Sequence, residues 1–187
     1  MQVLTRASAD DPFYDWLLPS GARREGALGD FFTLILSRMS GELAETYVTV
    51  DQAGIALWLA PGQHALSLVQ LARLAPGFVK VLGWGGIGRG LRVMRHMDRL
   101  HERYAPRPHF YLSVLAVAPG RQGQGLGREL LRPVLELCDA QGIGAYLETA
   151  RARNVPFYER QGFELRCREE HPEFPTFWCF AREPRRG

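Results

Sequence analysis

The chain has 187 residues, of which 46% are apolar and 23% charged, a composition typical of a soluble globular protein with one domain. Its formal net charge of +3 is too small to indicate a nucleic-acid partner by itself. The three cysteines, Cys138, Cys167 and Cys179, are odd in number and widely spaced, which fits neither a disulfide framework nor a zinc site.

The first sixty residues predict a strand, two helices and a hairpin. Residues 1–11 lack the apolar core of a signal peptide, so we expect a cytoplasmic protein. QVLTRA alternates in polarity and predicts a short first strand, whereas DPFYDWLL and GALGDFFTLILSRM carry apolar residues at helical spacing. The β-rich runs AETYVTVD and AGIALWLA meet at Asp51-Gln52, which predicts a hairpin that ends at Pro61-Gly62.

Residues 62–108 predict a helical insertion between the third and fourth strands, with two helices separated by WGGIGRG. The stretch holds eight basic residues against Asp98 and Glu102, so its net charge is +6. The simplest interpretation is an amphipathic helix with a solvated basic face. Two other roles of this insertion stay open: a roof that covers an acceptor pocket, or a site that binds an acidic partner. Interleaved aromatic residues are too sparse for nucleic acid, and Arg73, Pro76 and Lys80 interrupt the most apolar run, which argues against a membrane span.

The last eighty residues alternate between strands and helices. HFYLSVLAVAP predicts a strand, and RELLRPVLELCDAQG predicts an amphipathic helix that ends at Gly142. AYLETA predicts a strand, and NVPFYERQG predicts a short helix with Asn154 as its cap and Gly162 as its stop. FELRCRE and FPTFWCFARE predict the last two strands. We therefore expect one α/β domain over residues 1–187, with a mixed sheet of about seven strands.

The glycine-rich stretch RQGQGLG lies between a predicted strand and a predicted helix, where free N–H groups and the helix dipole favour an anion such as pyrophosphate. A Walker loop is excluded because Gly127 is followed by Arg128 and Glu129. The first two glycines of the dinucleotide-binding fingerprint are present, and so is its acidic residue, Glu148, about twenty positions on. Its third glycine is replaced by Arg128, so NAD binding ranks lower.

The loop resembles that of the GNAT acetyltransferases, whose pattern Gln/Arg-x-x-Gly-x-Gly/Ala is met by Gln122, Gly125 and Gly127. A second match lies in NVPFYERQGF, at the family's order and spacing. The last eighty residues are closest to the puromycin N-acetyltransferase branch, in AYLETARARNVPFYERQGF, in the terminal Trp-Cys and in Pro133. The resemblance implies the GNAT fold and acetyl-coenzyme A as the donor, without a metal.

By resemblance, the backbone of Leu115, Ala116 and Val117 holds the pantetheine arm, and an N–H there stabilises the acetyl oxygen. The remaining cofactor contacts implied by the family are Arg121, Gln122, Gly123, Gln124, Gly125, Leu126, Gly127, Arg128, Asn154 and Tyr158. The family match makes Tyr158 the acid that protonates the departing thiolate; the alternative is a packing tyrosine. Glu148 is expected to be the base or the amine anchor; the alternative is a rim glutamate paired with Arg151 or Arg153.

These residues predict an N-acetyltransferase that moves acetyl directly to a primary amine of a small molecule in a ternary complex. A catalytically silent acyl-coenzyme A sensor and, less favoured, an NAD-dependent enzyme are the alternatives. Acceptor contacts are expected among the aromatic residues Phe13, Tyr14, Trp16, Phe31, Phe32, Trp58, Phe174 and Phe177. The sequence leaves the acceptor, the acyl length and the oligomeric state open, a homodimer included.

Overall fold

The computed structural model describes residues 2–21, 24–39, 44–63 and 68–185. The helices are α1 (Gln2–Ala7), α2 (Pro12–Leu17), α3 (Arg24–Met39), α4 (Leu68–Tyr104), α5 (Leu126–Gln141) and α6 (Val155–Arg160), and a 3₁₀ turn, η2 (Ala152–Asn154), precedes α6. The strands are β1 (Ala44–Val48), β2 (Gly54–Leu59), β3 (His109–Val117), β4 (Gly144–Thr149), β5 (Glu164–His171) and β6 (Phe174–Arg182).

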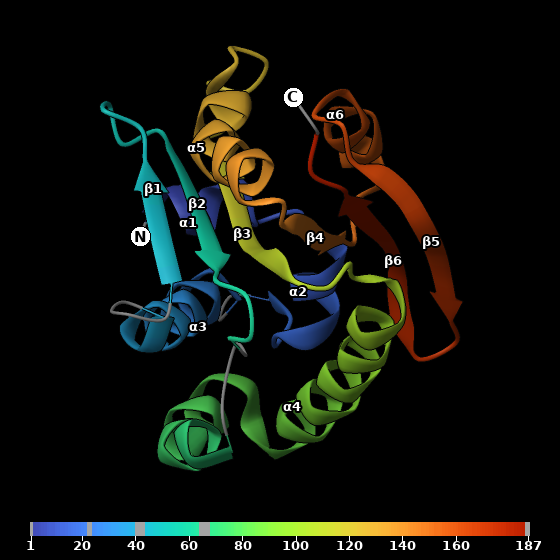
Figure 1. Ribbon diagram of the computed structural model, residues 1–187. Coiled ribbons are helices and arrows are strands. Elements are labelled where there is room, and N and C mark those ends of the chain that lie inside the picture. The colour runs from blue at the N-terminus through green and yellow to red at the C-terminus, as the bar shows by residue number, and fades with distance from the viewer. Residues whose placement is uncertain (1, 22–23, 40–43, 64–67, 186–187) are drawn as a thin grey trace.

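The strands form one sheet in the order β1-β2-β3-β4-β6-β5 (Figure 1). Only β3 and β4 run parallel among the described strands, and the other neighbours are antiparallel. Helices α5 and α6 cover one face, and α1 to α4 cover the other (Figure 1). The predicted mixed α/β architecture is confirmed.

The prediction of a first strand at residues 2–7 is wrong, because this segment forms helix α1. Leu4 and Ala7, three positions apart, are both buried, as expected for one face of a helix. They pack in an apolar cluster with Leu28 and Phe32 of α3. The described residues therefore form six strands rather than about seven.

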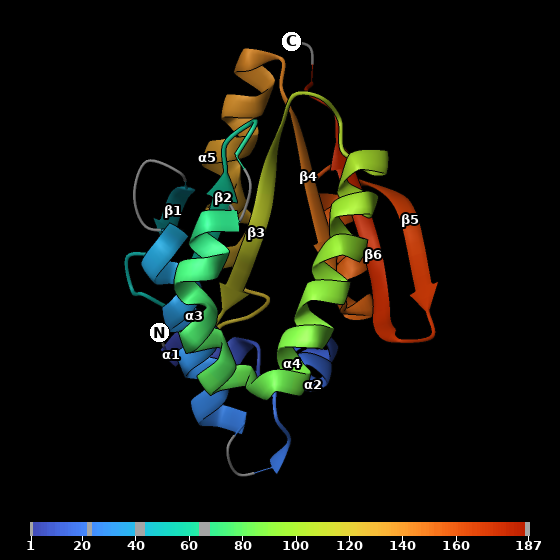
Figure 2. The same ribbon diagram turned by 90° about the horizontal axis from the view of Figure 1, so that it is seen from below.

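The break in α4 lies at Gly83, one residue before the predicted WGGIGRG interruption, and residues 84–90 are themselves helical. Gly83 has φ 66° and ψ 169°, a region that is essentially restricted to glycine. The two arms of α4 diverge from this elbow (Figure 2). The first arm packs through Leu74 and Phe78 with α3, and the second packs through Val93 and Leu100 against β6.

The other element predictions agree with the structure. The β1–β2 hairpin turns at Gln52, which has φ 55° and donates its N–H to the Thr49 carbonyl at 2.8 Å. Helix α5 runs through Pro133 and ends at Gly142, which has φ 67°. None of the described helices combines the length and apolarity that a membrane span requires.

Candidate functional site

Strands β3 and β4 separate where a site is expected. They pair only at His109–Gly144, Phe110–Ala145 and Tyr111–Tyr146. Beyond Tyr111, β3 continues to Val117 and stays paired with β2 on its other side, so the edge facing β4 has no strand partner. Leu115, Ala116 and Val117, the residues predicted to hold the pantetheine arm, belong to this stretch without a β4 partner. Because backbone groups alternate between the two edges of a strand, only some of their N–H and C=O groups face the open edge.

The loop between β3 and α5 has the backbone of an anion site. Gly120, Gly123 and Gly125 have φ between 76° and 86°, and no heavy atom lies within 4 Å of the position that a Cβ would take at any of them. Gly125 caps α5, and Glu129 is the first residue whose N–H bonds back, to the Gly125 carbonyl at 3.0 Å. The N–H groups of residues 126–128 therefore lack helical acceptors and lie at the positive end of the dipole.

Gly127 is a glycine for a different reason. It lies inside α5, and a Cβ there would be 3.0 Å from Cζ of Phe157 on α6. The residue thus permits α5 and α6 to approach closely, rather than opening the loop. Within one short stretch, the glycines serve both backbone conformation and helix packing.

Most polar side chains of the loop form hydrogen bonds or ion pairs that stabilise the loop itself. Gln122 donates to the Val117 carbonyl at 3.3 Å, and Gln124 donates to the Gly120 carbonyl at 3.2 Å. Arg121 pairs with Asp51 at the hairpin turn, 2.7 Å apart, and also donates to Gln124. Arg128 is exposed and has no ion pair with the described residues. Arg128 is therefore the side chain of the loop whose charge is available to an anion.

Glu148 lies on β4, two residues beyond the last pair with β3, and shares the α4-facing side of the strand with Tyr146. Both carboxylate oxygens are buried, and neither forms a hydrogen bond of good geometry within the described part of the chain. Burial raises the pKa of Glu148 to about 7; the phenols of Tyr111 and Tyr146 oppose this shift, and the charge of Asp98 adds to it. Glu148 is thus poised to gain and lose a proton near neutral pH.

The alternative in which Glu148 pairs with Arg151 or Arg153 is wrong. Arg151 pairs with Asp10 at 2.6 Å and with Asp11 at 2.9 Å, and Arg153 pairs with Asp10 at 2.8 Å. Asp11 also caps α2 by accepting the Phe13 N–H at 2.9 Å. These ion pairs fasten the start of α2 to the segment after β4, beside the unpaired edge of β3.

Tyr158 is buried on α6, with its ring against Phe163 and Phe180. Burial raises its pKa, the charge of Asp11 raises it further, and that of Arg151 lowers it. The same three influences act on Tyr14 of α2, which places both phenols near the Asp11–Arg151 pair. The structure thus brings Tyr158 to the end of the sheet where β3 and β4 part.

Asn154 is the N-cap residue of α6, as predicted, but its side chain makes no capping hydrogen bond. Its Nδ2 instead donates to Thr149 Oγ1 at 3.4 Å, which links the start of α6 to the end of β4.

The aromatic residues predicted to contact the acceptor lie in several different parts of the structure, and Phe31 packs against Phe32 and Phe78. Trp58 and Phe32 are core residues, 0% and 1% exposed. Phe13 and Trp16 of α2 pack against Phe177 and Phe174 of β6. Tyr14 is the member of the set that shares its electrostatic neighbours with Tyr158. Tyr111 and Asp98 could not be predicted from the sequence, because their proximity to Glu148 depends on tertiary packing alone.

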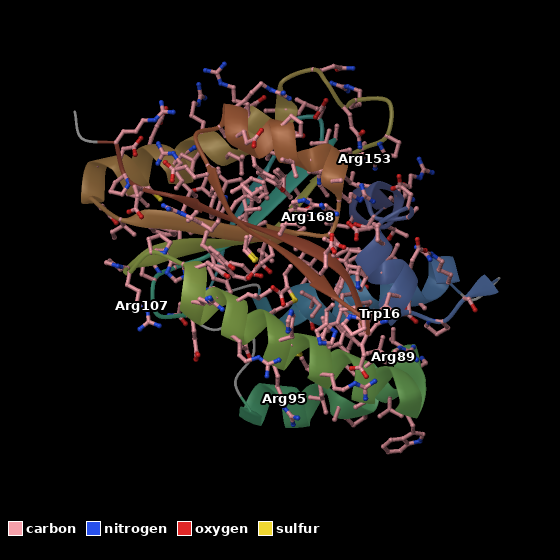
Figure 3. The ribbon with its side chains drawn as sticks, turned by 90° about the vertical axis from the view of Figure 1, so that its right-hand side faces the viewer. Trp16, Arg89, Arg95, Arg107, Arg153 and Arg168 are labelled. Atoms are coloured by element: carbon pink, nitrogen blue, oxygen red, sulfur yellow. The ribbon has the colours of Figure 1, made fainter. Side chains whose placement is uncertain are left out.

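The basic face of α4 is largely solvated, as the simplest interpretation expected. Arg95 of α4 and Arg107, just beyond its end, are exposed and point away from the sheet (Figure 3). Arg92 forms a surface pair with Glu173 at 3.7 Å. Arg89 differs, because it is half-buried and donates to the Leu17 carbonyl at 3.1 Å, next to the elbow. Arg89 thus has a structural role in joining α4 to α2.

Comparison with known sequences identifies relatives of this chain. The model of the acetyltransferase (GNAT) family matches residues 78–163, which include the glycine loop and Glu148. An uncharacterised N-acetyltransferase of Schizosaccharomyces pombe is 30% identical over 119 residues, covering 60% of this chain and 48% of the relative. The chain therefore spans about half the length of this curated relative. The closer likeness to the puromycin branch stays a prediction.

Solved structures share the fold. A Corynebacterium glutamicum protein described as histone acetyltransferase HPA2 and related acetyltransferase has a TM-score of 0.69 at 21% identity, covering 100% of this chain and 90% of that chain. Arylalkylamine N-acetyltransferase 2 of Aedes aegypti has a TM-score of 0.55 at 14% identity, covering 98% and 93%. The family model thus assigns residues 78–163 to the GNAT acetyltransferase superfamily, and the solved structures share the fold of the whole chain.

Proposed function

We propose that this chain transfers acetyl from acetyl-coenzyme A to a primary amine of a small molecule, directly and within a ternary complex. Acetyl transfer is the activity of the superfamily; the amine acceptor and the direct route are our proposal. The observation that carries it is Glu148, a buried carboxyl group without a hydrogen-bond partner among the described residues, next to the point where β3 and β4 part.

The residues present fit acetyl-coenzyme A. The N–H groups of residues 126–128 and the open backbone at Gly123 and Gly125 suit a pyrophosphate, and Arg128 adds an available positive charge. The backbone groups of residues 115–117 that face the open edge of β3, apart from the Val117 carbonyl that accepts from Gln122, are available to the amides of the pantetheine arm. When bound, acetyl-coenzyme A supplies an activated acetyl thioester.

Glu148 and Tyr158 supply the proton transfers in this proposal. An alkylammonium group has a pKa of roughly 10 and must lose a proton before it attacks, and a carboxylate with a pKa of about 7 accepts that proton in neutral solution. The raised pKa of Tyr158 keeps its hydroxyl protonated, so that it can donate a proton to the departing sulfur. Burial of both groups strengthens these interactions by excluding water.

The test is to measure thiol release from acetyl-coenzyme A with a panel of primary amines, and to confirm the acetylated product by mass spectrometry. We expect kcat/KM to fall below pH 7 in the wild type, because Glu148 becomes protonated. Glu148→Gln should lose about 100-fold to 10,000-fold and should lose this dependence. Binding of acetyl-coenzyme A without turnover of any amine would favour the sensor alternative.

A further inference from the structure

Three polar side chains lie in a row across the sheet. The strand register pairs Glu148 of β4 with Cys179 of β6, and pairs Cys179 with Cys167 of β5. Directly opposed residues of antiparallel strands project from the same face. This face is covered by α4, because Cys179 clusters with Val93 and Leu100, and Cys167 packs against the same cluster.

We propose that Cys167 and Cys179 form an oxidative modification site, at which a peroxide converts the two thiols to a cross-strand disulfide beside Glu148. Opposed residues in an antiparallel pair have Cα atoms about 4.5 to 5.5 Å apart. Disulfides span Cα separations of about 4.4 to 6.8 Å, which includes this range. The register is irregular between Leu165 and Cys167, but Cys167 and Cys179 are still directly opposed beyond that irregularity. Cys138 is not a competing partner, because it belongs to α5 and points into the core on the opposite face of the sheet.

The peroxide reacts first with Cys167, because Cys167 is half-buried whereas Cys179 is fully buried. The Cys167 thiol lies 3.8 Å from Oε2 of Glu169, which can receive its proton. The thiolate sulfur attacks one peroxide oxygen and the O–O bond breaks, which gives a sulfenic acid on Cys167 and a hydroxide ion that takes up the proton as water.

Cys179 completes the bond. Its sulfur displaces the hydroxyl group of the Cys167 sulfenic acid, so the S–S bond forms, the S–O bond breaks, and the thiol proton leaves with the hydroxide as water. Two thiols and one peroxide thus yield one disulfide and two waters. Burial raises the pKa of Cys179 to about 12, so this second step should be slow at neutral pH and should accelerate as the pH rises.

To test this, the full chain is treated with limiting hydrogen peroxide, and its intact mass and its number of free thiols are then measured. We expect the intact mass to fall by two hydrogen atoms, and the thiols titrated in denaturant to fall from three to the one of Cys138. Non-reducing peptide mapping should join the peptides of Cys167 and Cys179, and a dithiol reductant should reverse the change. Cys138→Ala should cross-link like the wild type.

Cys179→Ser removes the resolving thiol, so dimedone should label a sulfenic acid at Cys167, and Cys167→Ser should give neither product. Three surviving thiols would overturn the proposal, as would a cross-link through Cys138 or between two chains, or oxygen added to Cys167 without a cross-link. Because the readout is mass rather than acetyl transfer, a failure of the proposed activity would leave this result unaffected.

Discussion

At the level of single residues, the buried carboxylate of Glu148 lowers the free energy of unfolding. Its carboxylate is buried without a hydrogen-bond partner in the described part of the chain, and burial disfavours the charged form. A protein under selection for stability alone has no use for a carboxyl group at this position. Activity and stability are therefore opposed at Glu148, and each can be measured separately.

Glu148→Gln should stabilise the protein at alkaline pH. The pKa of Glu148 is raised from 4.5 to about 7, so between these values the folded state keeps a proton that the unfolded state has lost. The free energy of unfolding therefore falls as pH rises through this window, by about 3 kcal/mol. Urea unfolding should show Glu148→Gln to be more stable than wild type at pH 8 and equal to it near pH 4. The same difference at both pH values would contradict the account.

Tyr158→Phe should lower kcat by about 100-fold, because the variant has no proton to give to the departing sulfur. The ring contacts with Phe163 and Phe180 are kept, so the melting temperature and the affinity for acetyl-coenzyme A should change little. Steady-state kinetics beside a titration with acetyl-coenzyme A checks both parts. Unchanged turnover would assign Tyr158 to packing alone.

The sequence predicted that Glu148 lies at the end of a strand, but it did not predict which residues surround its side chain. Arg151 and Arg153 follow it closely, so spacing alone favours a surface ion pair with one of them. The structure shows instead that Asp10 and Asp11 hold these arginines, and that Arg151 and Asp10 are 141 positions apart. Periodicity and spacing carry no information on contacts at such separations.

At the scale of elements, the sequence predicted that α4 breaks but not where. The stretch from Gly83 to Gly90 contains several glycines, and each of them is able to adopt a positive φ. Only the packing of the two arms, against α3 and against β6, selects Gly83. The helix α1 was missed for a similar reason, because a six-residue segment shows too little periodicity to separate a helix from a strand.

Gly83→Ala and Gly85→Ala should have opposite effects. A Cβ at Gly83 meets no atom within 4 Å, so its cost is backbone strain alone, about 1 to 3 kcal/mol. Gly85 is helical and exposed, so alanine there should stabilise α4 by up to about 1 kcal/mol. Urea unfolding of both variants measures the two changes. Equal effects would show that Gly83 is not the elbow.

At the level of the whole molecule, an ion pair between a buried arginine and a partly exposed aspartate joins two elements that are distant in the chain. Asp139 of α5 accepts two hydrogen bonds from Arg182 of β6, at 2.8 and 2.6 Å, and one from the N–H of Arg185 at 2.7 Å. The Arg182 side chain is 4% exposed. The order of elements and two motifs sufficed to predict the fold class. The interactions of Asp139 with Arg182 and Arg185 could not be predicted in this way, because they depend on tertiary packing.

Asp139→Asn should lower the free energy of unfolding by about 3 kcal/mol, because it leaves the buried Arg182 guanidinium without its counter-charge. The pKa of Asp139 is lowered by Arg182, so the stabilisation it provides is present above its unfolded pKa of 3.8 and is lost as pH falls through the folded pKa. Glu136→Gln, in an exposed pair with Arg132, is the matched control and should cost under about 0.5 kcal/mol. Similar losses in both variants would refute this assignment.

The central claim is that the glycine loop and the unpaired edge of β3 bind acetyl-coenzyme A. Calorimetric titration with acetyl-coenzyme A, with coenzyme A and NAD run alongside, tests it most directly. We expect acetyl-coenzyme A to bind in a one-to-one complex and NAD not to bind. The absence of binding by either form of coenzyme A would contradict the account, because the loop and the edge would then lack the ligand on which the proposed chemistry depends.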